Sequence, residues 1–117
     1  MYETFMNLKP TNKLDGLTIL EDNRKDTGWI HGIVHGRSFA AKLYDEPSTY
    51  GIDSGRISKL SIYKTDQRDP NIEFFSQLDF NYDRGLDFNH LWKSNRKLYF
   101  KIIKTIEQIP PIGSSND

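Results

Sequence analysis

The sequence contains no cysteine, no long apolar run and no excess of either charge. Without cysteine the chain has no disulfides, no thiolate metal ligands and no cysteine nucleophile, which suits a reducing cytoplasm. Lysine plus arginine number 16, as do aspartate plus glutamate, so overall charge does not point to nucleic acid or a membrane surface. No stretch is apolar enough to span a bilayer, and the start MYETFMNLKP lacks the apolar run of a signal peptide. We therefore expect a cytoplasmic protein with no membrane partner.

What the sequence does contain fits one small domain. At 117 residues the chain can bury about two-thirds of the surface that its unfolded form exposes, which is enough for one core. Aromatic residues make up 13% and apolar residues 36%, so much of that core is expected to consist of rings. We predict a single α+β domain over residues 1–112, followed by a disordered tail at 113–117.

Alternation of apolar and polar residues predicts a twisted antiparallel sheet of about five strands. The expected strands cover residues 17–20, 29–34, 37–44, 56–64 and 72–80. The pair His35-Gly36 between the second and third strands can supply the positive φ angles of a tight hairpin turn. Ile57 is out of phase with Leu60 and Ile62, which predicts a bulge near the start of the fourth strand.

From Phe88 onward the apolar period changes from two to three and four, which is typical of a helix. Apolar residues recur at this spacing as far as Ile109, lysines occupy the other side, and Pro110 then stops the helix. We expect one long amphipathic C-terminal helix over residues 88–109, packed on one face of the sheet.

The lysines of this helix suggest one function. Their simpler interpretation is a solvated helix face balanced by an acidic sheet edge. In the alternative function, they make the chain a nucleic-acid-binding accessory or regulatory protein of a phage or plasmid, whose affinity would fall steeply with salt. The candidate nucleic-acid-binding residues are Lys93, Lys97, Lys101 and Lys104.

Carboxylates suggest a third class of function, a metal-dependent hydrolase. The candidates are Asp45, Glu46, Asp53, Asp79 and Asp83. Loop acids more often cap backbone amides, and no serine has the Gly-x-Ser-x-Gly context of an activated nucleophile. His31 and His35 lie about 13 Å apart along a strand and its turn, which is too far to share a metal. The sequence therefore predicts no catalytic residue, no metal site and no cofactor.

Turn-forming and charged residues are densest in the run DEPSTYGIDSGRISKL, at residues 45–60. Glycine at position 51 can supply a positive φ in one turn, and Asp53-Ser54-Gly55 can close a second. A hairpin between the fourth and fifth strands would bring this run to the turn-rich segment NYDRG, at residues 81–85. We interpret the run first as a structural clasp, locked by an ion pair of Arg56 with Asp83 or of Arg84 with Asp53.

The same two segments carry a family resemblance. YGI-x-x-GRISKL at residues 50–60 and NYDRG, with WIHG at 29–32 and FAAKLYDEPS at 39–48, resemble a family of short uncharacterised phage and plasmid proteins of Gram-positive bacteria. The resemblance covers roughly residues 28–87 and carries no assigned activity. It implies a mobile genetic element and the cytoplasm of a bacterial host. Some similar short proteins are anti-CRISPR proteins that bind Cas9 or its guide-RNA complex.

We therefore expect a non-enzymatic binding protein that inhibits a host defence system, in its most specific form an anti-CRISPR inhibitor that binds Cas9 directly. A Cas9-type target holds nucleic acid in a basic channel, which an acidic local surface would block. As an exposed edge strand would also permit pairing between copies, both a monomer and a homodimer are open. The candidate partner-binding residues are Glu46, Tyr50, Asp53, Arg56 and Arg84.

Overall fold

The computed structural model describes residues 14–114, which form six strands, two α-helices and three short 3₁₀ helices. The strands are β1 (Leu17–Asn23), β2 (Trp29–Val34), β3 (Arg37–Leu43), β4 (Ile57–Tyr63), β5 (Leu78–Asp83) and β6 (Leu86–Phe88). The α-helices are α1 (His90–Ser94) and α2 (Arg96–Glu107). The 3₁₀ helices are η3 (Ile52–Ser54), η4 (Phe75–Gln77) and η5 (Ile112–Ser114).

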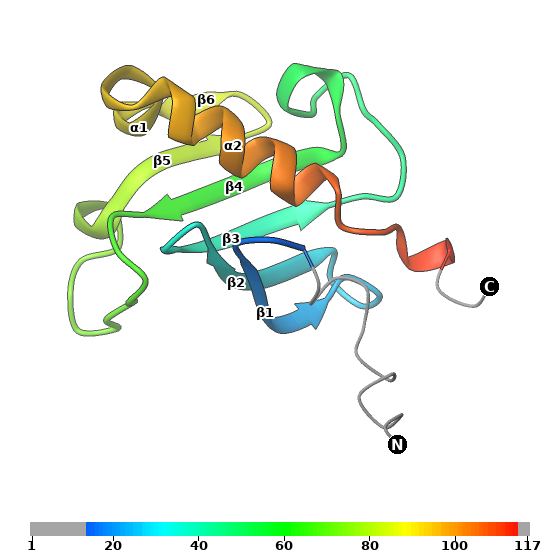
Figure 1. The fold of residues 1–117 in the computed structure, drawn as a ribbon, viewed down its shortest axis with the longest axis horizontal. Helices are drawn as coiled ribbons and strands as arrows, with labels where there is room; N and C mark the ends of the chain where they lie inside the picture. The colour runs from blue at the N-terminus through cyan, green and yellow to red at the C-terminus, as the bar shows by residue number, and fades with distance from the viewer. Residues whose placement is uncertain (1–13, 115–117) are drawn as a thin grey trace.

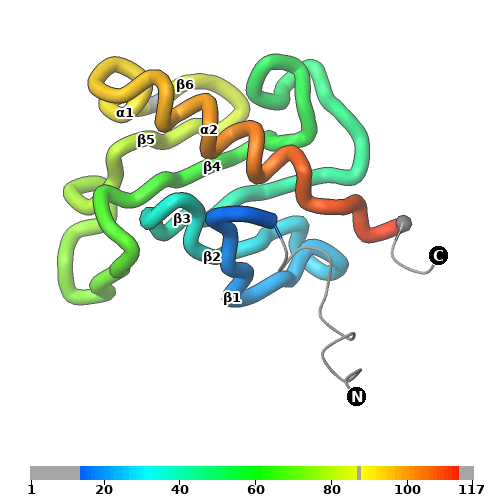
Figure 2. The backbone as a smooth tube through the Cα atoms, in the orientation of Figure 1, coloured from blue at the N-terminus to red at the C-terminus, as the bar shows by residue number. Residues whose placement is uncertain are grey.

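The strands form one antiparallel sheet whose order in space follows their order along the chain, from β1 at one edge to β6 at the other. The backbone passes from strand to strand across the sheet from β1 to β5, and α2 then crosses one face of the sheet (Figures 1 and 2). The architecture is therefore α+β, as the sequence predicts. The sheet has a sixth strand, because β6 takes residues that the sequence assigns to a turn and to the start of the helix.

Two local predictions for the sheet are confirmed. Val34 pairs with Arg37 across a two-residue hairpin turn in which His35 and Gly36 have φ angles of 47° and 83°. Positive φ at both positions matches the right-handed twist of the flanking strands. In β4 the pairing with β3 shifts by one residue next to Ile57, so the predicted bulge is present and lets Ile57 join the core.

The core lies between the sheet and α2. From the sheet, the face toward α2 contributes Ile30, Val34, Phe39, Ala41, Leu43, Leu60, Ile62 and Phe80. The helix contributes Tyr99, Ile102, Ile103 and Ile106, which recur at helical spacing, and their ring and branched side chains fill the layer. The rings of Phe80 and Tyr99 meet across this layer with their centroids 5.0 Å apart.

The predicted strand over residues 72–80 is wrong in its first half. β5 begins only at Leu78, and residues 64–77 form a loop that ends in η4. Side chains in this loop bond to its own backbone: the Glu73 carboxylate accepts the amide protons of Phe75 and Ser76 at 3.1 and 2.8 Å. Such local bonds compete with strand pairing. Apolar residues that alternation places in the core, Ile72 among them, are therefore exposed.

The single long helix over residues 88–109 is also wrong. Phe88 pairs with Asn81 as part of β6, and the helical stretch is divided at Asn95, which has φ −151°. The Asn95 side chain accepts the amide proton of Leu98 at 3.1 Å, so this residue caps a new helix instead of continuing the old one. Asparagine is more favourable at the start of a helix than in its interior. This preference outweighs the helical spacing of apolar residues, which continues without interruption across Asn95.

The ends of the chain are described in part. Residues 1–13 of the predicted domain and residues 115–117 of the predicted tail lie outside the described residues. Within the predicted tail, Gly113 belongs to η5, and its amide donates to Asp45 Oδ2 at 3.2 Å. No helix within residues 14–114 is long and apolar enough to cross a membrane.

Candidate functional site

Two loops meet near the start of β4, and we call residues 46–54 and 83–86 the two-loop surface. Asp83 pairs with Lys59 in the sheet, and the Arg84 amide donates to the Ser58 carbonyl at 2.9 Å, so the second loop lies beside the residues that follow the first. Four of the five predicted partner-binding residues lie exposed on this surface: Glu46, Tyr50, Asp53 and Arg84. The Tyr50 residue has 65% of its surface exposed.

The two loops are joined, but not by the predicted ion pairs. Tyr82 Oη donates to the carbonyl of Tyr50 at 2.9 Å, which ties the tip of the first loop to the strand that enters the second. Neither predicted ion pair occurs among residues 14–114, since Asp83 Oδ1 lies 3.6 Å from Lys59 Nζ and 3.5 Å from Arg84 Nε. These contacts are exposed and contribute little to stability.

The first loop closes on itself through backbone contacts around Gly51. The Ser48 amide donates to the Gly55 carbonyl at 2.9 Å, and the Gly51 amide donates to the Ser48 carbonyl at 3.0 Å. The positive φ predicted for Gly51 is wrong, because its φ is −76°. Glycine is needed for close approach instead: a Cβ at this position would lie 2.0 Å from the carbonyl oxygen of Gly55.

Strained backbone is concentrated in the two-loop surface. Within residues 14–114 four non-glycine residues have positive φ, and three of them lie here: Asp53 at 53°, Ser54 at 58° and Arg84 at 56°. Left-handed backbone costs a residue with a side chain of order 1 kcal/mol or more, and such residues cluster at binding and catalytic sites. In the second loop the strain falls on Arg84 although Gly85 is its neighbour.

Arg56, the fifth predicted partner-binding residue, is not on the surface. It is only 9% exposed, and its Nη1 donates to the carbonyls of Glu107 and Ile109, each at 2.8 Å. Its Nε donates to the Tyr44 carbonyl, also at 2.8 Å. A guanidinium is well placed there because the last carbonyls of a helix lack intrahelical partners and carry partial negative charge. Arg56 was predicted to form a clasp with Asp83, but it bonds instead to the C-terminal end of α2.

Two more residues complete this contact, which we call the C-terminal anchor. Arg24 Nη1 donates to the carbonyl of Pro110 at 3.0 Å, while its Nε and Nη2 bond to Asp22. Asp45 accepts the amide proton of Ile112 at 2.8 Å, and this backbone bond is the main reason that the pKa of its carboxyl is lowered. The anchor binds the chain beyond α2 to both ends of the β3–β4 connection.

Asp79, another of the candidate carboxylates, is buried and bonds to the side chains of Arg37 and His90. Arg37 Nη1 donates to its Oδ2 at 2.6 Å, and His90 Nδ1 bonds to its Oδ1. Burial by itself raises the pKa of this carboxyl, but the hydrogen bonds of His90 and Arg37 and the charge of Arg37 together hold the pKa below its usual value. The network ties β3, β5 and α1 together.

Stability should therefore depend on Asp79 at acid pH. The lowered folded pKa means that the unfolded chain binds this proton more readily, so the contribution is complete above the unfolded value of about 3.9. We expect it to be lost as pH falls through the lower folded pKa. Urea unfolding between pH 7 and pH 2.5 should show a steeper loss in the wild type than in Asp79→Asn. Equal slopes for the two proteins would contradict this assignment.

The histidines and the remaining acids do not gather into a metal centre. His35 Nε2 bonds to Thr105 Oγ1 at 2.8 Å, whereas His31 Nδ1 accepts from Arg68 Nη2 at 3.0 Å. Burial and the charge of a nearby cation lower the pKa of both histidines, the cation being Lys101 for His35 and Arg68 for His31. No group of three or more His, Asp or Glu side chains in the described part of the chain could hold a metal ion.

The predicted nucleic-acid-binding lysines divide at the helix break. Lys97, Lys101 and Lys104 follow one another on α2 at intervals of four and three residues, which places them on one stripe of the helix. Lys93 belongs to α1, on the other side of Asn95. All four side chains are exposed, so both helices present cations to solvent.

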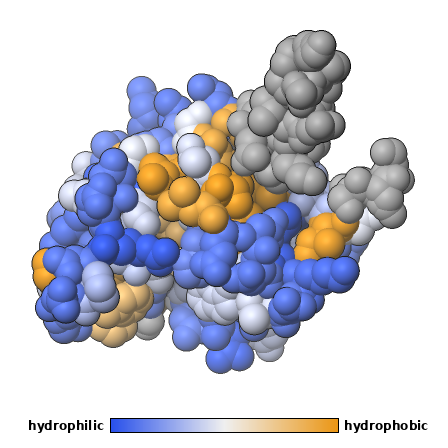
Figure 3. All heavy atoms as spheres, turned by 90° about the horizontal axis from the view of Figure 1, so that it is seen from below, coloured by the Kyte–Doolittle hydropathy of each residue, from blue (hydrophilic) through white to orange (hydrophobic). Residues whose placement is uncertain are grey.

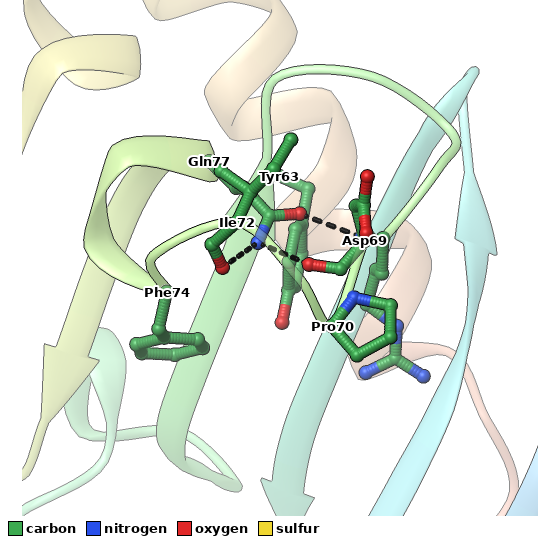
Figure 4. A pocket seen from close by; sticks show the side chains of 7 residues that line it. Tyr63, Asp69, Pro70, Ile72, Phe74 and Gln77 are labelled. Carbon is green, nitrogen blue, oxygen red and sulfur yellow. Dashed lines mark hydrogen bonds between the residues drawn. The ribbon is translucent and has the colours of Figure 1, made fainter.

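The sheet carries a concave surface that was not predicted from the sequence. We call it the sheet groove, and it is lined chiefly by Trp29, His31, Ala40, Ser61, Tyr63, Arg68 and Phe74. It lies on the face of β2–β4 opposite α2. A second pocket adjoins it under the 64–77 loop, where Gln77, Pro70 and Phe74 lie around Tyr63 (Figure 4). The alternation within WIHG places Trp29 and His31 on this face, and this pattern is the feature of the sequence from which the groove could have been predicted.

The β1 edge of the sheet bears on the homodimer prediction. Seen from below Figure 1, this edge shows an apolar patch among hydrophilic side chains (Figure 3). Leu20 on β1 is 63% exposed. The pairing of β1 with β2 shifts between Ile19 and Glu21, and a bulge on an edge strand disfavours pairing with a second sheet.

Comparisons with known proteins give one match. The family model described as Domain of unknown function (DUF7678) matches residues 28–107, which include β2 to α2 and both loops of the two-loop surface. No curated protein and no solved structure matches this chain.

Proposed function

Because the chain belongs to the DUF7678 family, a domain of unknown function, we propose its function from the site itself: a non-enzymatic binding protein that contacts its target through the two-loop surface. The observation that carries the proposal is the strained, side-chain-bearing backbone at Asp53, Ser54 and Arg84, next to the exposed ring of Tyr50. Glycine at these positions would relieve the strain, so the side chains are kept at a cost in stability.

The geometry of Tyr50 supports the same conclusion. Tyrosine and arginine are the residue types that most often dominate the binding energy of protein interfaces. The Tyr50 carbonyl is held by Tyr82 and its amide donates to Ser48 Oγ at 3.1 Å, so the ring stands on a fixed backbone. An anchor that is already ordered loses less conformational entropy when a partner binds.

For the target we propose a host defence protein of a bacterium, in its most specific form Cas9, bound directly by a protein of a phage or plasmid. The support for this class is the resemblance of YGI-x-x-GRISKL and NYDRG, both of which fall in or beside the two-loop surface. Glu46 and Asp53 add acidic groups to that surface, as occlusion of a basic nucleic-acid channel requires. The bacterial cytoplasm is the compartment in which the two proteins would meet.

The test measures binding to purified Cas9, alone and loaded with guide RNA. Tyr50→Ala should weaken binding at least about tenfold, as expected for an interface anchor. Arg84→Gly should also weaken binding while it raises the free energy of unfolding by about 1 kcal/mol, since glycine accepts a positive φ. A gain in stability that accompanies a loss of binding separates a binding role from a structural one.

Phe75→Ala is the matched control. Phe75 is an aromatic residue exposed to a similar degree, but it lies beyond the other end of β4, about 20 Å along the strand. Its loss should leave binding unchanged. Equal losses for Tyr50→Ala and Phe75→Ala would remove the two-loop surface as the contact site, and no binding to either form of Cas9 would remove Cas9 as the target.

A further inference from the structure

The sheet groove exists because its floor consists of small side chains. His31, Ala40 and Ser61 are direct cross-strand neighbours on β2, β3 and β4, so they form one row across the sheet. Ala40 and Ser61 rise little above the backbone, while the larger side chains around them form walls. The resulting space has a volume of about 510 Å³, within the range of sites that hold small ligands.

Aromatic rings form the walls of the groove. Trp29 and His31 stand on β2 with their ring centroids 6.4 Å apart. Tyr63 meets Phe74 of the 64–77 loop edge to face, with centroids 6.2 Å apart. The guanidinium of Arg68 lies 5.5 Å from the centroid of the Tyr63 ring. Aromatic rings and guanidinium planes are the groups on which proteins stack unpaired bases.

The loop that carries Arg68 and Phe74 is held in shape by Gln77 (Figure 4). The Gln77 side-chain amide donates to the carbonyls of Asp69 and Ile72 at 2.9 and 3.0 Å and accepts the Asp69 amide proton at 2.8 Å. The Gln77 side-chain amide thereby supplies hydrogen bonds that hold the turn, in place of backbone pairing with a neighbouring strand. The walls on this side of the groove are therefore fixed before any ligand arrives.

Cations at the groove favour an anionic ligand. Arg68 lines the groove, and Lys42 is the cross-strand neighbour of Trp29. Neither of these cations forms an ion pair with a carboxylate among residues 14–114. Glu21 is the one acidic residue in the lining. A stacking surface with Arg68 in its lining and Lys42 on the neighbouring strand position matches a ligand that is both aromatic and negatively charged.

We propose that the sheet groove binds single-stranded nucleic acid, with one base against its aromatic walls and the adjoining phosphates at Arg68 and Lys42. The small floor gives a flat base room to enter, and the Ser61 hydroxyl offers an acceptor to a base amino group. The site lies on the face of the sheet opposite the lysines of α2 and does not depend on the two-loop surface. Binding by stacking predicts little sequence preference and a marked dependence on salt.

The experiment uses Trp29 as its own reporter. Trp92→Phe leaves Trp29 as the only tryptophan, and this protein is titrated with oligothymidylate and oligouridylate of about ten nucleotides, with a matched duplex and with thymidine monophosphate. We expect quenching of Trp29 fluorescence by both single strands, weakly by the mononucleotide and not by the duplex. If the mononucleotide quenches Trp29 fluorescence as strongly as the single strands do, the ligand of the groove is a free nucleotide and not a strand.

Variants locate the site through the anisotropy of a labelled single strand. Ala40→Leu fills the floor and Trp29→Ala removes a wall, and each should weaken binding about tenfold or more. Arg68→Gln should weaken binding and reduce the slope of log affinity against log salt by about 1. Thermal unfolding of each variant shows whether it remains folded, and Arg68→Gln tests the groove at an exposed position even if the other two do not fold.

The control is the double variant Lys97→Ala, Lys101→Ala on the opposite side of the protein. It should bind the strand as the wild type does. Loss of binding in this control, with full binding in the groove variants, would overturn the proposal and assign the strand to α2. Absence of binding by the wild type at low salt would overturn it as well, and would favour a protein segment as the occupant of the groove.

Discussion

Replacing Arg56 by alanine should lower the free energy of unfolding by about 3–4 kcal/mol. The guanidinium donates to three carbonyls, those of Tyr44, Glu107 and Ile109, each at 2.8 Å. Alanine leaves these acceptors without their donor in a region from which water is largely excluded. A buried acceptor that loses a charged donor loses more than the net energy of an ordinary hydrogen bond, because its desolvation is no longer offset.

Arg56→Lys is the informative companion variant. Lysine keeps the charge near the end of α2, but a single ammonium cannot reach all three carbonyls as the planar fork of arginine does. We expect about half the loss seen for alanine. Urea unfolding followed by circular dichroism gives both values, and Arg84→Ala, at a largely exposed arginine, serves as the control with little change. A loss below about 1 kcal/mol for Arg56→Ala would contradict the C-terminal anchor.

The second large effect is expected for Gly51→Ala, at about 2–3 kcal/mol. The new Cβ would lie 2.0 Å from the oxygen and 2.8 Å from the carbon of the Gly55 carbonyl. Both atoms belong to the backbone, so no side chain can turn aside to make room. The first loop has to open, and the bond between Ser48 and Gly55 is the first to be lost.

Gly85→Ala provides the matched control in the second loop. A Cβ at Gly85 meets nothing within 4 Å, and its φ is not positive, so stability should change by less than about 0.5 kcal/mol. The same pair of variants tests the two-loop surface: Gly51→Ala should weaken target binding because Tyr50 loses its position. If Gly51→Ala unfolds like the wild type, the close approach of Gly51 to Gly55 is not required for folding.

The two large effects are connected through the chain between Gly51 and Arg56. Gly55 lies against Glu107, whose Oε2 accepts the amide proton of Arg56 at 2.9 Å. One end of the first loop is therefore fixed by the C-terminal anchor, and its tip is fixed by the bond of Tyr82 to Tyr50. A binding surface held at both places keeps its shape without a partner, as a strained loop requires.

The sequence by itself determined the features that depend on neighbours along the chain. Period-two alternation and the His35-Gly36 turn specify the β2–β3 hairpin, and the phase of Ile57 specifies the bulge in β4. The exposed positions of Tyr50 and Arg84 also follow from loops rich in turn-forming residues. These inferences succeed because hydrophobic phase and turn geometry act over a few residues.

Only the tertiary structure decided which distant groups meet. Arg56 was assigned to a carboxylate in the second loop, yet it binds carbonyls at the end of α2, because backbone acceptors have no signature in the sequence. Ile72 alternates like a strand residue and lies exposed, because Glu73 and Gln77 bond to the nearby backbone. The sheet groove likewise requires residues of β2, β3, β4 and the 64–77 loop to converge. Which distant groups come into contact depends on which arrangement of the chain gives the most buried polar groups a hydrogen-bond partner. That is a property of the whole fold.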